Sequence, residues 1–255
     1  MKTTENTILI TGGASGIGRA LAESFHALGN KVIIAGRRQT ALAAVVRANP
    51  GIAALTLDIG NADSISSFAK ELLAQHPALN AVIHNAGIMR AENLLTAPDY
   101  LGDAEETITT NLFGPVRLNA GLLPHFLKQP AATIITVSSG LAFTTLARYP
   151  TYCATKAAIH SYTESLRYQL KDTKIEVVEL APPYVQTELT GAHQASDPHA
   201  MPLKDFIAES LRLLSTTPTP PEILVERVKP LRFSARGDYA GFFKNFNEQM
   251  ARTTH

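Results

Sequence analysis

The sequence predicts an α/β fold: a doubly wound parallel sheet of about seven strands, with helices on both faces. Three observations support this prediction. Short apolar runs alternate with amphipathic stretches along the chain. A glycine-rich turn separates the first apolar run from the first amphipathic stretch. The 255 residues, of which 45% are hydrophobic, suit one domain that spans residues 1–255 and has a filled core.

Hydrophobic periodicity predicts the strands and helices of the first two thirds of the chain. Strands, recognised as short apolar runs, are expected at residues 6–11, 31–35, 53–57, 81–84, 133–137 and 175–180. Helices, recognised by apolar residues on one face, are expected at residues 19–25, 40–48, 63–75, 105–128 and 151–171. Because a helix follows each strand, consecutive strands are expected to lie parallel.

The last third of the chain is less regular. Residues 187–203 read as a loop. After this loop we expect a helix, a proline-rich turn, a seventh strand and a short amphipathic segment, at residues 204–214, 216–221, 222–229 and 242–250 respectively.

The first predicted strand ends in the glycine-rich turn Gly12-Gly13-Ala14-Ser15-Gly16-Ile17-Gly18. A strand, a glycine turn and a helix in this order form the fingerprint of a dinucleotide site. Glycine lets the backbone approach a pyrophosphate closely, and the helix N-terminus offers free N–H groups and partial positive charge. The alternative is that the turn has a purely structural purpose. The position of the glycines at the first strand–helix junction makes this alternative less favoured. The residues expected to bind the dinucleotide here are Gly12, Ser15, Gly16, Ile17 and Gly18.

The end of the second strand indicates which dinucleotide binds. An acidic residue at this place would hold the ribose hydroxyls of NAD. This chain instead has Gly36, followed by Arg37 and Arg38. Guanidinium groups suit a phosphate because they donate paired hydrogen bonds. We therefore expect NADP (NADPH), with Arg37 as the first phosphate ligand; the alternative is that one of the arginines only begins the next helix in solvent.

Further unusual residues stand at the carboxyl ends of predicted strands. They are Asp58, Asn85-Ala86-Gly87, Ser139 and Pro182-Pro183. Ligands of open parallel sheets bind at this edge. Each group has a structural explanation by itself, but their common placement favours a binding site.

Tyr152 and Lys156 lie four residues apart on a predicted helix, and Tyr152 follows Ser139 by thirteen residues. One helical turn puts the phenol and the ammonium on the same face. The ammonium is expected to lower the tyrosine pKa, so that the phenol can exchange a proton with a carbonyl or alcohol oxygen near neutral pH. The serine hydroxyl can hold the same oxygen. Alone, this spacing is common on helix surfaces, and it gains weight from the glycine turn.

Composition argues against several classes of protein. The formal net charge is +1 and no long basic run occurs, so we expect neither nucleic acid nor an anionic membrane as a partner. The single cysteine, Cys153, cannot form an internal disulfide, which fits a reducing, cytoplasmic compartment. No apolar run suits a signal peptide or a membrane span. No metal site is expected.

Taken together, these residues resemble the short-chain dehydrogenase/reductase family, over the range from Thr11 to Lys229. The resemblance implies a Rossmann-type fold and an NADP-dependent oxidoreductase. It implies catalytic roles for Asn111, Ser139, Tyr152 and Lys156. It also implies cofactor contacts from Gly12, Gly16, Gly18, Asp58, Ile59, Asn85, Ala86, Gly87, Tyr152, Lys156, Pro182, Val185 and Thr187.

Two departures from the family pattern concern the pocket. His84 stands where the family usually has asparagine, and we expect it to be a packing variant. Pro183 stands where the family often has glycine, and a second proline should stiffen the wall beside the nicotinamide. At finer grain, residues 85–95 and 180–189 resemble a bacterial, DltE-like subgroup.

The resemblance also implies how the site would reduce a carbonyl. A hydride passes from NADPH to the carbonyl carbon, while Ser139 and Tyr152 donate hydrogen bonds to the oxygen and Tyr152 delivers the proton. Lys156 would hold the nicotinamide ribose. Asn111 would hold a water that links Lys156 to solvent.

The substrate, a small-molecule carbonyl compound or secondary alcohol, is expected between residues 88–100, 140–150 and 184–202. A mostly apolar pocket is typical of such ligands. The side chains expected to supply its surface are Leu141, Phe143, Leu146, Tyr149 and Tyr184. The loop at residues 187–203 either closes over the substrate or is an ordered insertion.

Two other functions stay open. A non-catalytic NADP-binding regulator would usually lack the tyrosine or the lysine. A sugar-nucleotide epimerase or dehydratase can share Tyr-x-x-x-Lys, but usually has a longer chain and another glycine spacing. The resemblance further implies a homodimer or homotetramer, with subunit faces on the helices at residues 111–126 and 151–170.

Overall fold

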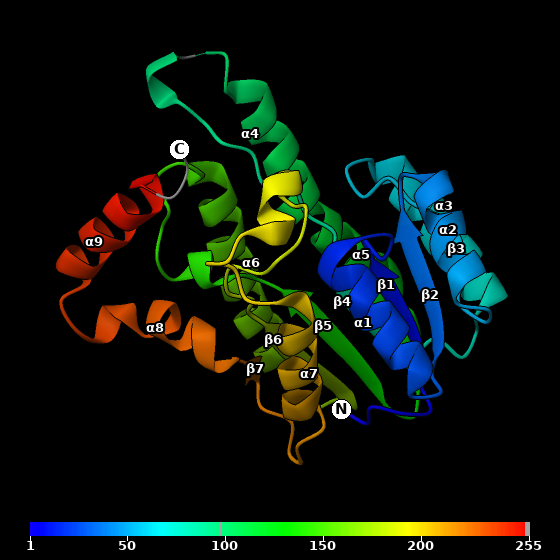
Figure 1. Cartoon of the computed structure of the whole chain (residues 1–255). Helices are drawn as coiled ribbons and strands as arrows, with labels where there is room; N and C mark the ends of the chain where they lie inside the picture. Colours follow the sequence, from blue (N-terminus) through cyan, green and yellow to red (C-terminus); the bar gives the residue numbers. More distant parts are fainter. Residues whose placement is uncertain (97, 253–255) are drawn as a thin grey trace.

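The computed structural model describes residues 1–96 and 98–252, and it confirms the predicted fold class (Figure 1). Within these residues a parallel sheet of seven strands has the order β3-β2-β1-β4-β5-β6-β7. The strands are β1 (Thr7–Thr11), β2 (Lys31–Gly36), β3 (Ala53–Thr56), β4 (Ala81–His84), β5 (Ala132–Val137), β6 (Ile175–Leu180) and β7 (Glu222–Ile223). β1 pairs with both β2 and β4, so the strand order reverses beside β1. A crevice at such a reversal is where open α/β sheets bind ligands.

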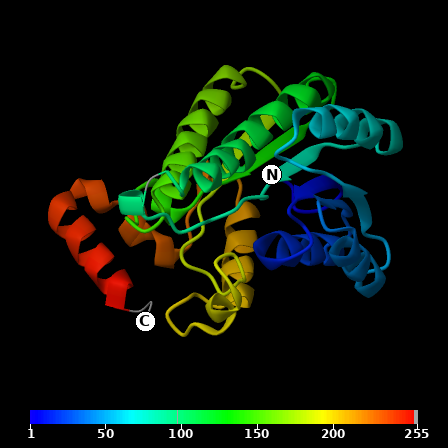
Figure 2. The ribbon, with the colours of Figure 1, turned by 90° about the horizontal axis from the view of Figure 1, so that it is seen from above.

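Helices cover both faces of the sheet, as Figure 2 shows from above. One face is covered by α3 (Ala62–Gln75), α5 (Gly114–Phe126) and α6 (Pro150–Gln169), and the other by α1 (Gly16–Ala27), α2 (Gln39–Ala48) and α7 (Leu203–Leu214). Each face has its own apolar core. Phe68 and Phe126 belong to the first core, and Phe25 and Phe206 belong to the second.

The prediction of one continuous α-helix at residues 105–128 is wrong. The chain forms α4 (Leu101–Ile108), then a π-helical turn (Thr109–Phe113), then α5. A π turn inserts an extra residue into the helical repeat, and such turns occur often at functional sites. Asn111 lies in this turn.

The prediction of a seventh strand at residues 222–229 is also wrong for the residues after Ile223. The chain leaves the sheet there and forms a 3-10 turn (Glu226–Val228) and then α8 (Lys229–Arg232). Pro230 stands in the first turn of α8, where its fixed φ and missing N–H suit a helix start.

The C-terminal segment and the loop before α7 are more ordered than predicted. α9 (Tyr239–Arg252) is longer than the segment expected at residues 242–250, and it stands apart from the two helix layers (Figures 1 and 2). The loop at residues 187–203 contains a 3-10 turn (Ala192–Ser196). None of the helices in the described part of the chain is long and apolar enough to cross a membrane.

Candidate active site

A cavity of about 1030 Å³ opens at the carboxyl ends of the strands and extends from the glycine turn to α9. Most of the residues predicted for the site line it. They are Gly12, Ser15, Gly16, Ile17, Arg37, Arg38, Ile59, Asn85, Ala86, Gly87, Ser139, Tyr152, Lys156, Pro182, Val185 and Thr187. Of the other predicted residues, Gly18, Asp58 and Asn111 lie beside the cavity wall rather than in it.

The glycine turn has the backbone shape that its sequence predicts. Gly12 and Gly16 have φ angles of +69° and +53°, which favour glycine. A Cβ on Gly18 would lie 2.3 Å from Asn85 Nδ2 and 2.5 Å from Gly12 O. Gly18 therefore allows α1 to pack closely against the turn. The start of α1 lines the cavity through Gly16 and Ile17, so a bound pyrophosphate would meet free N–H groups there.

Both arginines after β2 are exposed and line the cavity. Arg38 Nη2 donates to Ser15 Oγ at 3.3 Å, which joins it to the glycine turn. Arg37 Nη1 lies 3.6 Å from Glu106 Oε1. Exposed ion pairs contribute little, so a phosphate can displace this contact. This end of the cavity therefore presents two guanidinium groups, which could donate hydrogen bonds to a phosphate group.

Asp58 lies differently from its neighbour Ile59. Its side chain is exposed, and its Oδ1 accepts a hydrogen bond from Gly60 N at 3.0 Å. Ile59 is buried and lines the cavity.

Ser139, Tyr152 and Lys156 come together at the centre of the cavity and are all buried. Ser139 follows β5. Its hydroxyl accepts a hydrogen bond from Leu141 N at 3.1 Å and lies close enough to Tyr152 to affect the pKa of the phenol. Lys156 Nζ lies 5.5 Å from the centre of the Tyr152 ring. The same ammonium donates to Val137 O, at the end of β5, at 2.8 Å. The helical spacing and the strand end thus place a phenol, a hydroxyl and a lysine side chain in one site.

The expected direction of the Tyr152 pKa is not what the structure shows. Burial, the largest influence, raises the pKa of the phenol, and the hydrogen bond from Ser139 opposes this only in part. Burial lowers the pKa of Lys156 to about 8, against the negative charge of Glu179, which raises it. Both groups are removed from water in the folded protein, and this burial, which favours their neutral forms, cannot be read from the spacing of the two residues.

Asn111 projects from the π turn toward the loop after β4. Its Oδ1 accepts from Ile88 N at 2.9 Å, and its Nδ2 donates to Ile88 O at 2.9 Å. Nδ2 also lies 3.2 Å from Thr155 Oγ1. A Cβ on Gly87 would lie 3.2 Å from Asn111 Oδ1 and 3.7 Å from Lys156 Nζ. Asn111 therefore fixes the loop beside the lysine, and glycine at position 87 permits this close approach.

His84 behaves as the packing residue that we expected. It is buried, and its Nε2 lies 2.7 Å from Asn119 Oδ1. Burial lowers the pKa of His84 to about 4, so it is neutral near pH 7. Pro182 also supports the fold, because its carbonyl oxygen accepts from Gly140 N at 2.8 Å.

The far end of the cavity contains a wall that the sequence did not predict. α8 and α9 contribute the lining residues Leu231, Phe246, Asn247, Met250 and Ala251. Asn247 Oδ1 accepts from Ala147 N at 2.6 Å, and its Nδ2 donates to Thr145 O at 3.0 Å. These bonds attach α9 to the segment before α6. The spacing of Phe242, Phe246 and Met250, each four residues apart, is the signal that points to one apolar helix face.

The predicted pocket segments contribute only in part. Of residues 88–100, the cavity is lined by Ile88, Met89 and Arg90, and Ala97 lies outside the described residues. Leu141, Leu146, Tyr149 and Tyr184 line it as expected. The prediction for Phe143 is wrong, because it does not line the cavity; its ring packs against His160, with ring centres 4.7 Å apart.

The loop at residues 187–203 is held by polar contacts, one buried and one partly buried. Gln194 Nε2 donates to Val185 O at 2.8 Å, and Tyr184 Oη donates to Asp197 Oδ2 at 2.9 Å. Val185 also pairs with Met201 as a β-bridge. The loop thus forms an ordered wall. Across the described residues, no cluster of three or more histidine, cysteine or acidic side chains is arranged to hold a metal.

Known proteins share both the sequence pattern and the fold. The profile of the short chain dehydrogenase family matches residues 6–198. The uncharacterized oxidoreductase DltE of Bacillus subtilis (strain 168) is 40% identical over 252 residues, which cover 98% of this chain and 99% of that protein.

Two solved structures share the fold at lower identity. A short chain dehydrogenase from Burkholderia cenocepacia, in complex with NADP, has a TM-score of 0.82 at 23% identity, covering 96% of this chain and 98% of that one. A short chain dehydrogenase/reductase from Burkholderia phymatum, in complex with NAD, has a TM-score of 0.81 at 21% identity, covering 96% of each chain. The chain belongs to the short-chain dehydrogenase family, is DltE-like, and is an oxidoreductase of the kind that uses a nicotinamide cofactor.

Proposed function

We propose that this chain transfers a hydride between NADP(H) and a carbonyl compound or secondary alcohol, with Tyr152 as the acid–base group. One observation carries the proposal: the cavity that begins at the glycine turn is also lined by Ser139, by Tyr152 and by Lys156, whose ammonium lies 5.5 Å from the centre of the Tyr152 ring. A dinucleotide at the turn and a carbonyl at the tyrosine can therefore occupy one continuous space.

The preference for NADP rests on the end of β2. Gly36 leaves room there, and Arg37 and Arg38 supply two guanidinium groups at the cavity. Arg38 is already directed at the glycine turn through Ser15. Arg37 would exchange its exposed contact with Glu106 for the phosphate.

The chain's own residues would position and protonate the substrate oxygen. The bound nicotinamide supplies the hydride. Ser139 and Tyr152 donate hydrogen bonds to the carbonyl oxygen as negative charge develops on it. Tyr152 passes its proton to that oxygen, so the product is an alcohol. Lys156 stabilises the phenolate that remains, and Asn111 holds the neighbouring loop.

The substrate end favours an apolar compound. Leu146, Tyr152 and Cys153 form a small apolar cluster with Met89, Leu141, Tyr149, Phe246 and Met250. A carbonyl carried on an aliphatic or aromatic body suits this surface better than a polyhydroxylated one.

A binding assay and a turnover assay test the proposal together. We expect NADPH to bind more tightly than NADH, and a panel of apolar aldehydes and ketones to cause loss of NADPH absorbance. NADPH binding without turnover on any member of a broad panel would favour the alternative, a non-catalytic NADP-binding regulator.

We also propose one cytoplasmic domain that assembles as a homodimer or homotetramer. Leu101, Ile108 and Phe113, on α4 and the π turn, are between 37% and 50% exposed, which leaves apolar surface for a second copy. Tyr168 on α6 is also exposed. Sedimentation of the purified protein tests this assembly, and a monomer at micromolar concentration would contradict it.

A further inference from the structure

A buried carboxylate, Glu179, stands on β6 close to the active site. Ile175 and Val177 share its face of the strand and pack in the apolar core under α5 and α6. The alternation therefore predicts an apolar side chain at position 179, but the sequence has glutamate, which is completely buried. Burying a carboxylate is unfavourable unless it is paired. Its neighbours must therefore supply interactions that offset the cost of burying this carboxylate.

His160 on α6 supplies one partner. Its Nδ1 lies 2.7 Å from Glu179 Oε2. Glu179 Oε1 has no hydrogen-bond partner among the described residues. The hydrogen bond to Glu179 raises the pKa of His160. One oxygen of the carboxyl group is thus held by the imidazole, while the other has no direct hydrogen bond.

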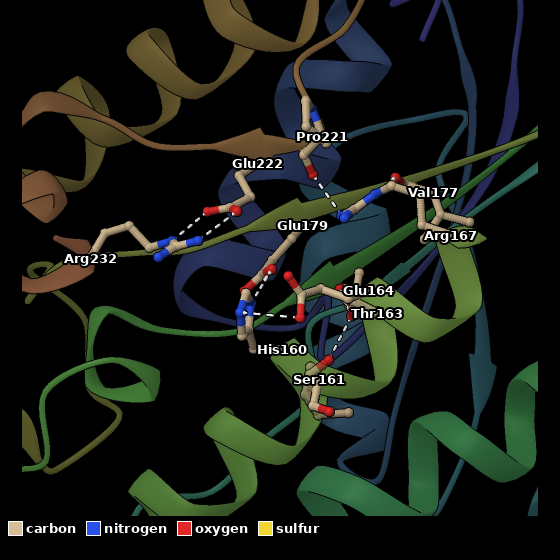
Figure 3. A network of polar contacts seen from close by, with 12 residues as sticks. His160, Ser161, Thr163, Glu164, Arg167, Val177, Glu179, Pro221, Glu222 and Arg232 are labelled. Atoms are coloured by element: carbon tan, nitrogen blue, oxygen red, sulfur yellow. Dashed lines mark hydrogen bonds and ion pairs between the residues drawn. The ribbon is translucent and has the colours of Figure 1, made fainter. Parts of the chain in front are cut away.

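The charges around this pair come from three elements, as Figure 3 shows. Glu164, one helical turn after His160, lies 3.8 Å from His160 Nε2 and is 58% exposed. Arg232 on α8 makes two bonds to Glu222 on β7, at 2.6 and 2.9 Å. Arg167 on α6 donates to the backbone oxygens of Val177 and Pro221. Glu222 is thus paired with Arg232, and the charge of Glu179 acts on Arg232 as well as on His160.

Lys156 lies near this carboxyl group. Glu179 pairs with Thr136 in the register of β5 and β6, and Lys156 Nζ donates to the carbonyl oxygen of the next residue of β5, Val137, at 2.8 Å. Tyr152, Lys156 and His160 follow one another at four-residue intervals, so they lie along one face of α6. Burial lowers the pKa of the Lys156 ammonium, and the charge of Glu179 is the influence that raises it. Inside a protein such an attraction is screened far less than in water.

We propose that Glu179 and His160 form a positioning pair that keeps Lys156 protonated beside Tyr152. His160 holds the Glu179 side chain in place by hydrogen bonding, and Glu179 stabilises the ammonium through its charge. This inference deepens the proposed function, since the protonated lysine is what stabilises the tyrosine phenolate.

Direct titration of Lys156 tests the pair without any substrate. The protein is labelled with ¹³Cε-lysine, the Lys156 signal is assigned through Lys156→Met, and its shift is followed against pH by NMR. In Glu179→Gln, which removes the charge at nearly constant shape, we expect the Lys156 midpoint to move down by about one pH unit. Glu179→Asp keeps the carboxylate and should move the midpoint by less than half of that.

Glu164→Gln is the matched control, because it removes a carboxylate on the other side of His160 that is exposed to solvent. Its Lys156 midpoint should stay within a few tenths of a pH unit of the wild type. Equal midpoints in the wild type and Glu179→Gln would overturn the proposal. An equal downward shift in Glu164→Gln would also overturn it, because the effect would then be general.

A second variant covers the case in which Glu179→Gln does not fold. His160→Leu removes the hydrogen bond that holds the Glu179 side chain, so we expect a weaker attraction between Glu179 and Lys156, and the Lys156 midpoint should again fall. A folded His160→Leu protein with the wild-type midpoint would contradict the pair. Turnover separates this inference from the proposed function: an absent NADPH-dependent activity with a displaced Lys156 titration would contradict the function alone.

Discussion

The two ends of the cavity are built in different ways. At the nucleotide end, the wall consists of turns that directly follow β1, β2 and β4, and each carries its own sequence signature. At the substrate end, the wall joins segments that are far apart in the chain, as in the bond between Asn247 and Ala147. The nucleotide end is therefore determined by local sequence, and the substrate end by tertiary contacts. Proteins of this fold can thus keep the nucleotide end of the cavity while the residues of the substrate end change.

Tyr152→Phe should have the largest effect, and it acts where the two ends meet. Removing the hydroxyl takes away the proton donor, so kcat should fall by about 10²- to 10⁴-fold. The NADPH dissociation constant should hardly change, because the glycine turn is intact. Stopped-flow turnover and fluorescence titration measure the two quantities.

Tyr168→Phe is the matched control for this loss. It makes the same change on the same helix at a residue that is 70% exposed, and it should retain wild-type turnover. Wild-type rates in Tyr152→Phe on a verified substrate would remove the tyrosine from its role.

Charge reversal after β2 should have the next largest effect and should act on the nucleotide end alone. Arg37→Asp and Arg38→Asp each remove a guanidinium, so each should weaken NADPH binding about 10- to 100-fold and shift preference toward NADH. Arg47→Asp, on the exposed side of α2, controls for the change in net charge. Calorimetric titrations with both cofactors give the result, and unchanged constants in both variants would contradict the phosphate role.

Changes in α9 should act on the substrate end alone. Phe246→Ala removes an apolar wall, so KM for an apolar ketone should rise about 10-fold while NADPH affinity stays constant. Asn247→Ala breaks the bonds to Thr145 and Ala147 and should give a similar but smaller rise. Phe243→Ala serves as control, since Phe243 does not line the cavity. Steady-state kinetics would contradict this division if NADPH affinity fell as well.

The extent of sequence prediction follows the same division. The glycine turn and the Tyr152–Lys156 spacing were recognisable because each reflects a local backbone geometry. The wall on α9 was not, because nothing local to Phe246 indicates that it meets Leu146 and Tyr149. The short β7 and the π turn at Asn111 also escaped prediction, since both depend on how neighbouring elements pack. The pKa of Tyr152 was misjudged because burial is a tertiary property.

His84 should give the smallest effect on the site. The unfolded chain binds a proton at His84 near pH 6.5, whereas the folded protein excludes it until about pH 4. As the pH falls from 6.5 to about 4, the free energy of unfolding should therefore decrease by an amount on the order of 3 kcal/mol. Thermal unfolding across this range should show a shallower decline in His84→Asn than in the wild type. Identical slopes would mean that the folded protein accommodates the protonated ring.

Transfer of deuterium from 4-deuterated NADPH tests the central claim most directly, that one cavity brings the nicotinamide and a carbonyl together at Tyr152. Wild-type protein is incubated with the labelled cofactor and a panel of apolar aldehydes and ketones, and the products are analysed by mass spectrometry. We predict deuterium on the carbinol carbon of at least one product, and its loss in Tyr152→Phe saturated with the cofactor. Unlabelled products throughout, with NADPH demonstrably bound, would contradict the account.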